Sequence, residues 1–131
     1  MPTIEIAYET KTGLSYDEAI ARCREALAGE GFGVLTEIDI QATLKKKLDV
    51  DIEPHVILGA CHPPSAYRVL QAMPQIAVML PCNVTVAVEK GQTVVRAMNP
   101  EAAMGLLDNP EVTAVATEIG QALKRVLAAV E

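Results

Sequence analysis

The 131-residue chain has no tryptophan, one phenylalanine and three tyrosines. Proteins that bind single-stranded nucleic acid stack bases on aromatic side chains, and this chain has few of them. It is also short of basic residues, because 11 lysines and arginines against 17 aspartates and glutamates give a net charge of −6. Its one basic run, at residues 45–47, is followed at once by acidic residues. We therefore expect no nucleic-acid partner.

Long apolar runs are absent as well, although half of the residues are hydrophobic. A membrane-spanning helix needs roughly 20 consecutive apolar residues, so we expect no membrane association. The chain begins with neither a basic stretch nor the apolar core of a secretory signal. Its three cysteines form no C-x-x-C pair, which argues against a zinc ribbon or a thioredoxin-type site. We expect a cytoplasmic protein in a reducing compartment.

The length predicts one domain, residues 1–131, with enough apolar residues for a sizeable core. Alternating residues predict strands over 3–10 and 33–40, and a hairpin over 83–98 that turns at Lys90 and Gly91. Residues 55–61 are apolar on both faces, which predicts a central strand. A capping box at Ser15 and Glu18 opens a helix that ends near Gly29. Further helices are expected over residues 41–48 and 63–73 and after Asn99 and Asn109, where an N-cap precedes a first-turn proline.

The same patterns predict which side chains face inward. In the first strand these are Ile4, Ile6 and Tyr8. In the second strand, Val34, Thr36, Ile38 and Ile40 share one face, with Glu37 and Asp39 on the other. The helix over residues 41–48 turns Leu44 and Leu48 inward. The hairpin puts one valine-rich set on the inner face: Val84, Val86, Val88, Thr93, Val95 and Ala97.

The predicted order of elements is β-α-β-(α)-β-α-β-β-α-α. The hairpin has to be antiparallel, because its turn is too short for a crossover. We therefore expect an α+β fold, with a five-stranded, mainly antiparallel sheet and helices packed on one face.

Two cysteines stand at the boundaries of predicted elements. Cys61 ends the strand His55–Cys61 just before a helix N-terminus, where backbone N–H groups and the helix dipole stabilise a thiolate. Cys82 opens the next strand, after Pro81. If the two strands are antiparallel, both thiols lie at one end of the sheet, and if they are parallel, they lie ~20 Å apart. Cys23 lies on the apolar stripe of the first helix, where we expect it to be buried and inert.

Around these cysteines the chain resembles the DUF302 family, a domain of unknown function. The matching segments are Gly-Ala-Cys-His-Pro-Pro at residues 59–64 and Leu-Pro-Cys-Asn-Val at residues 80–84. The resemblance extends from about residue 4 to about residue 126. It implies an antiparallel α+β fold and no established activity.

Other residues near the motifs are candidates for the same site. His62 and Asn83 each follow one of the two cysteines. The family often has asparagine at the position of His62, which argues against this histidine as an essential base. Asp39 and Lys47 match recurring family positions. Asp39 is expected to cap the following helix or to pair with one of its lysines. In a functional interpretation, Lys47 directs a positive charge at an anionic ligand near the thiols.

Three functions stay open. The first is a binding module with a thiol-based site at Cys61 and Cys82, which would take a soft metal, Cu(I) before Zn, or serve sulfur-carrier or thiol-redox chemistry. The second is a structural or interaction protein whose cysteines only pack, with Thr85, Ala87 and Val94 on an open sheet face as the contact. Because of this open face we expect the chain to form a homodimer. The third is an enzyme with Cys61 as nucleophile, which lacks an evident residue to orient His62 as its base. The sequence names no ligand, metal, pathway or dimer interface.

Overall fold

The computed structural model describes residues 5–131. Its elements follow the predicted order, with one additional 3-10 helix, η1. They are β1 (Ala7–Thr12), α1 (Tyr16–Gly29), β2 (Gly33–Asp39), α2 (Ile40–Leu48), β3 (His55–Cys61), α3 (Pro63–Ala72), η1 (Pro74–Met79), β4 (Cys82–Glu89), β5 (Gln92–Met98), α4 (Pro100–Met104) and α5 (Pro110–Val130).

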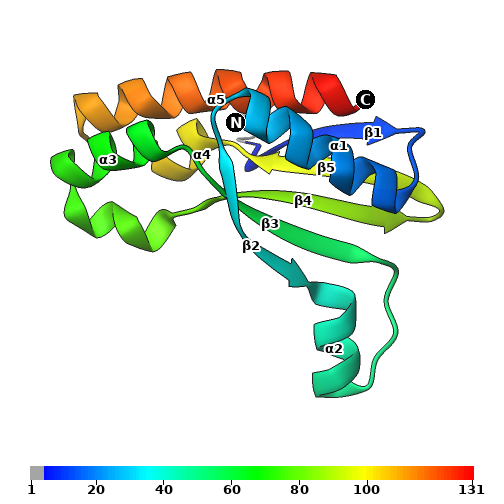
Figure 1. Ribbon diagram of the computed structural model, residues 1–131. Coiled ribbons are helices and arrows are strands. Elements are labelled where there is room, and N and C mark those ends of the chain that lie inside the picture. Colours follow the sequence, from blue (N-terminus) through cyan, green and yellow to red (C-terminus); the bar gives the residue numbers. More distant parts are fainter. Residues whose placement is uncertain (1–4) are drawn as a thin grey trace.

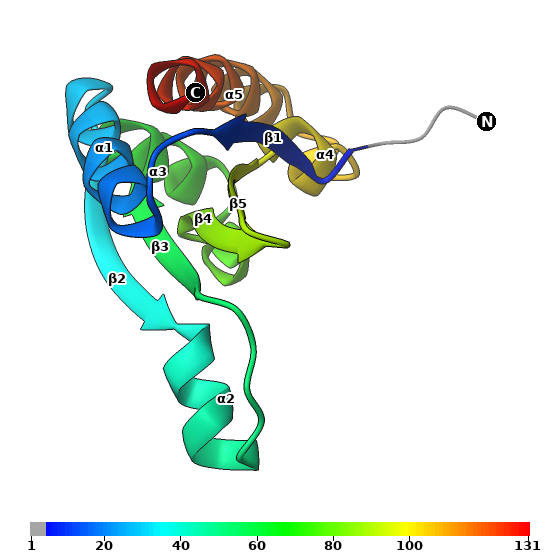
Figure 2. The same cartoon turned by 90° about the vertical axis from the view of Figure 1, so that its right-hand side faces the viewer.

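The described part of the chain forms one five-stranded sheet in the order β1-β5-β4-β3-β2, and every neighbouring pair is antiparallel. Helices α1, α3, α4 and α5 lie on one side of this sheet, whereas α2 projects beyond the end of β2, away from these helices (Figures 1 and 2). The predicted α+β fold is therefore confirmed. No helix within residues 5–131 is long and apolar enough to cross a membrane.

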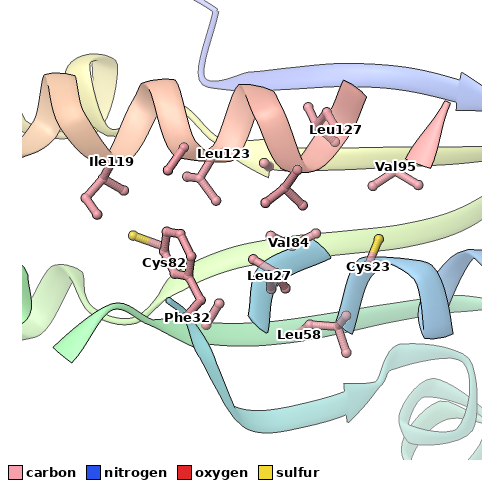
Figure 3. Packing of buried hydrophobic residues seen from close by; sticks show 14 of the residues in the cluster. Cys23, Leu27, Phe32, Leu58, Cys82, Val84, Val95, Ile119, Leu123 and Leu127 are labelled. Atoms are coloured by element: carbon pink, nitrogen blue, oxygen red, sulfur yellow. The ribbon is translucent and has the colours of Figure 1, made fainter. Parts of the chain in front are cut away.

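The core lies between the sheet and helices α1 and α5 (Figure 3). Leu27 of α1, Leu58 of β3 and Leu123 of α5 are fully buried in it. Burying a leucine side chain contributes ~1.5–3 kcal/mol, so residues of this kind supply most of the stabilisation. Cys23, on the inner face of α1, is fully buried among them, as its place in the helical stripe predicts.

Local sequence signals hold where they concern neighbouring residues. Ser15 and Glu18 form the complete capping box, and Asn99 and Asn109 both cap helices that start with proline. The hairpin turns at Lys90 and Gly91, which both have positive φ. Its register pairs the residues that the alternation placed on one inner face: Val84 with Ala97, Val86 with Val95, and Val88 with Thr93.

The first strand differs from its prediction in position and in one inward residue. Residues 3 and 4 of the predicted strand lie outside the described residues, and β1 runs two residues further than expected. Ile6 precedes β1 and is 81% exposed, so its inward assignment was wrong. Tyr8 does face inward, and its hydroxyl donates a hydrogen bond to Asn99 Oδ1 at 3.0 Å.

The predicted faces of β2 are wrong beyond Val34, because the strand contains a β-bulge. Val34 pairs with Ala60 but Thr36 pairs with Gly59, so Leu35 is the additional residue. A bulge of one residue exchanges the two faces of everything that follows it. Glu37 and Asp39 therefore share the inner face with Leu58 and Val56, while Ile38 is 48% exposed.

Helix α2 also differs from expectation. Asp39 is its N-cap and accepts a hydrogen bond from the backbone N–H of Ala42 at 2.9 Å, as predicted. Leu48 is 66% exposed, however, so its inward assignment was wrong. Leu44 is half-buried, since the helix extends away from the sheet and touches only its margin at β2 and β3 (Figure 1).

Gly59 is a point of close approach, and we predict that Gly59→Ala is destabilising. A β-carbon at this position would collide with Thr36 Oγ1 and would lie 3.0 Å from Pro81 Cγ. We expect a loss of ~1–3 kcal/mol in the free energy of unfolding, measured by urea denaturation. Gly33→Ala is the matched control, because no atom lies within 4 Å of its added carbon. Adding Thr36→Ala should recover part of the loss, and an unchanged stability of Gly59→Ala would contradict the packing described here.

Candidate functional site

The two boundary cysteines lie on neighbouring strands. β3 and β4 pair antiparallel, and Cys82 stands directly opposite Ala60, one residue before Cys61. Because neighbouring strands are ~4.8 Å apart, the end of β3 and the start of β4 form one local cluster. The structure therefore confirms the antiparallel arrangement on which a shared site depends.

The two thiols occupy different environments. Cys82 shares the inner face with Ala60 and is 8% exposed, and its sulfur lies toward Ile119 of α5 (Figure 3). Cys61 is the last residue of β3 and is half-buried. Alternation along β3 would place Cys61 on the opposite face from Ala60 and Cys82, but the strand ends at Cys61, and both thiols line one pocket at this end of the sheet. Both cysteines are free.

Burial controls the acidity of two of the three thiols. Burial raises the pKa of Cys82 to about 11, and the neighbouring Cys61 thiol adds to this shift. Burial alone raises the pKa of Cys23 to about 12. Both groups therefore stay protonated at neutral pH.

A pocket of about 230 Å³ opens at this end of the sheet. Its polar side chains are Cys61, Cys82, His62 and Ser65. The other walls are apolar and come from elements far apart in the sequence: Leu35, Ala60, Ala66, Val69, Leu80, Pro81, Pro100, Met104, Val115, Ala116 and Ile119. No lysine, arginine, aspartate or glutamate of residues 5–131 lines it. The site is thus an apolar cavity with two thiols and one imidazole in its wall.

His62 is held by contacts that do not involve either thiol. It is the N-cap residue of α3, and its Nδ1 lies 2.7 Å from Ser65 Oγ, within hydrogen-bonding distance. Its ring also packs edge-on against Phe32, with centroids 5.3 Å apart. Ser65 is 5% exposed, so the pair is a largely buried polar contact at the pocket wall. No motif in the sequence marks Ser65 as a site residue, although a position three residues after an N-cap is where such a partner is found.

The structure does not bring the other predicted site residues into the pocket. Asn83 pairs with Gly59 and is exposed, so it points away from Cys82. Lys47 lies on α2, beyond the end of β2 at Asp39, which pairs with Val56 at the far end of β3 from Cys61. Asp39 is engaged as a helix cap.

The donor set near the thiols is small. In the part of the chain that the structure describes, no three His, Cys, Asp or Glu side chains are grouped to hold a metal ion. A structural zinc site takes four such ligands, so these residues do not fit zinc. Two thiols suit a soft ion of low coordination number.

The fold and this site define a small α+β domain with a thiol-bearing apolar pocket. The chain belongs to the DUF302 family, "Domain of unknown function DUF302", whose model matches residues 7–130. It is similar to the crystal structure of an uncharacterized conserved DUF302 protein from Bacillus stearothermophilus, with 30% sequence identity and a TM-score of 0.92. That match covers 98% of this chain and 100% of the other. The comparison with curated proteins found no match.

We predict that the three cysteines react with iodoacetamide in the order of their exposure. Cys61 should be alkylated first in the folded protein, Cys82 more slowly, and Cys23 only when the protein unfolds, because alkylation needs an accessible thiolate. Mass spectrometry of peptides sampled over time measures the three rates. In denaturant all three should react at similar rates. Labelling of Cys23 as fast as Cys61 in the folded state would contradict the burial described here.

Proposed function

We propose that this chain is a binding module whose pocket takes a compact, neutral and mainly apolar molecule, with Cys61 and Cys82 as soft contacts in its wall. The observation that carries the proposal is the composition of the pocket, which is apolar apart from two thiols, His62 and Ser65. An ionised ligand would lose its hydration there without gaining an oppositely charged partner, which is strongly unfavourable. A neutral ligand has no such penalty and gains from the apolar walls.

The size of the pocket limits the ligand. Its volume of about 230 Å³ is below the range of ~300–1,000 Å³ that is typical for drug-sized ligands. We therefore expect a molecule of one or two small rings or a short branched chain. The hydrogen bond between His62 and Ser65 leaves few polar groups to orient it, so shape is the main source of specificity.

Indole is a suitable probe, because it is neutral and fluorescent and the chain has no tryptophan to interfere. We predict that titration with the protein shifts indole emission to shorter wavelength. Ala116→Leu fills the pocket from α5 and should weaken binding by at least about tenfold, or ~1.4 kcal/mol. Ala114→Leu, on the exposed side of the same helix, is the matched control and should bind as the wild type does.

Circular dichroism verifies that both variants are folded. Absence of any emission shift with the wild type would contradict the proposal. Equal binding by Ala116→Leu and the wild type would show that indole binds elsewhere.

A second candidate ligand is a monovalent copper ion bound by Cys61 and Cys82. The specific observation in its favour is the proximity of the two thiols on neighbouring strands. Soft thiolates select Cu(I), and two sulfur ligands are enough for it. Because burial raises the pKa of Cys82 to about 11, copper would have to displace a proton from this thiol at neutral pH.

We predict that, if copper is a ligand, its affinity increases as the pH rises from 6 to 8, by up to about tenfold per unit for each proton released. Anaerobic competition with a colorimetric Cu(I) chelator measures this affinity. Cys61→Ala and Cys82→Ala should each abolish competition. Cys23→Ala is the control, since Cys23 is also buried and protonated but does not line the pocket. Equal loss in all three variants, or none in any, would exclude the site.

A further inference from the structure

Helix α2 contacts β2 and β3 in its own chain but is only lightly packed against them. None of its nine residues, all of them within the described part of the chain, is buried. It extends beyond the end of β2, away from α1, α3, α4 and α5 (Figures 1 and 2). A helix shorter than ~12 residues is marginal in water, and most helices are stabilised by packing of one face. Contact with a second molecule would therefore stabilise this helix.

Exposed apolar side chains gather on this part of the molecule. We define the arm as residues 38–50, which comprise α2 and its two junctions. Within it, Ile38 is 48% exposed, Leu48 is 66% exposed and Val50 is 41% exposed. These residues lie at the two ends of α2, and exposed apolar residues along one projecting segment are typical of an interaction site.

The outer face of the sheet does not offer the contact that the sequence predicted. Ala87 and Val94 lie on that face but are each only 2% exposed. Arg96, on the same face, forms ion pairs with Glu9 at 2.7 Å and with Glu89 at 2.6 Å, so polar side chains occupy its surface. The hairpin part of this face therefore offers little apolar surface, whereas the arm carries three exposed apolar residues.

The charge distribution indicates what kind of partner fits the arm. Helix α2 contains three lysines and no acidic residue, whereas the whole chain has a net charge of −6. Asp39 and Asp49 reduce the net charge of the arm to +1, so the rest of the chain carries −7. Lys45 pairs with Asp49 at 3.0 Å and with Asp51 at 3.2 Å, so Lys46 and Lys47 are the lysines of the arm that lie outside this ion pair. Their positive charges are attracted to the acidic body of a second copy, and such complementarity guides association.

We propose that the arms of two copies pack against each other in a two-fold symmetric homodimer, with Ile38, Leu48 and Val50 at the centre of the contact. In such a dimer the same patch meets itself, so a single contact covers the exposed apolar residues of both copies. The lysines of each α2 then lie near the acidic body of the other copy. This association is separate from ligand binding in the pocket, since the arm leaves β2 at Asp39, at the far end of β3 from Cys61.

We predict a dimer for the wild-type chain at high micromolar concentration, and a monomer or a dimer weakened at least about tenfold for Leu48→Asp, measured by sedimentation equilibrium. The matched control is Leu106→Asp, because Leu106 is 97% exposed but lies between α4 and α5, away from the arm. It should dimerise as the wild type does. Both variants replace exposed side chains and should remain folded, which circular dichroism verifies.

Three further measurements separate the arm from other interfaces. The double variant Lys46→Glu with Lys47→Glu should weaken the dimer, and added salt should weaken the wild-type dimer. Hydrogen exchange of the α2 amides should slow as protein concentration rises. A wild type that is monomeric at high micromolar concentration overturns the proposal and assigns the arm to a different protein. A dimer unaffected by Leu48→Asp, or α2 exchange independent of concentration, also overturns it.

Discussion

The antiparallel pairing of β3 with β4 is the interaction on which the rest of the structure depends. β3 is the link between the hairpin of β4 and β5 and the strand β2, because the sheet order places it between them. The same pairing sets Cys82 opposite Ala60 and so brings Cys61 and Cys82 to one end of the sheet. Since α3 and η1 connect these strands, they lie at that end as well and contribute Ser65, Val69 and Leu80 to the pocket. The site is thus a consequence of strand register.

How well the sequence predicts the fold depends on the distance over which each signal acts. Caps at Ser15, Asn99 and Asn109 and the turn at Lys90 involve residues a few positions apart, and all are found as predicted. Alternation in β2 failed because a bulge adds one residue, and neither glycine nor proline marks Leu35 as its position. Helical spacing in α2 correctly indicates a helix but does not reveal whether anything packs against it.

The same distinction explains what could be predicted of the site. Cys61 and Cys82 were found because each stands at the boundary of an element with a clear sequence signal. Met104 and Ile119, which form the opposite wall, carry no signal that separates them from other core residues. Asp39 and Lys47 follow β2, and Asp39 pairs with Val56 of β3. Because β2 and β3 are antiparallel, this places Asp39 and Lys47 at the end of β3 that is far from Cys61. Only the tertiary structure separates these groups.

The bulge at Leu35 has a consequence for how the chain can vary in length. Deleting Leu35 would remove the bulge but would leave the pairing and the faces of residues 36–39 unchanged. The ion pair of Arg24 with Glu37, at 2.8 Å, would therefore be kept, whereas loss of a second residue from the strand would exchange the faces and break it. Residues 49–51, between α2 and the segment that leads into β3, are exposed and outside any strand. Changes in length should therefore be tolerated at the tip of the arm, whereas β2 tolerates only the loss of its one additional residue.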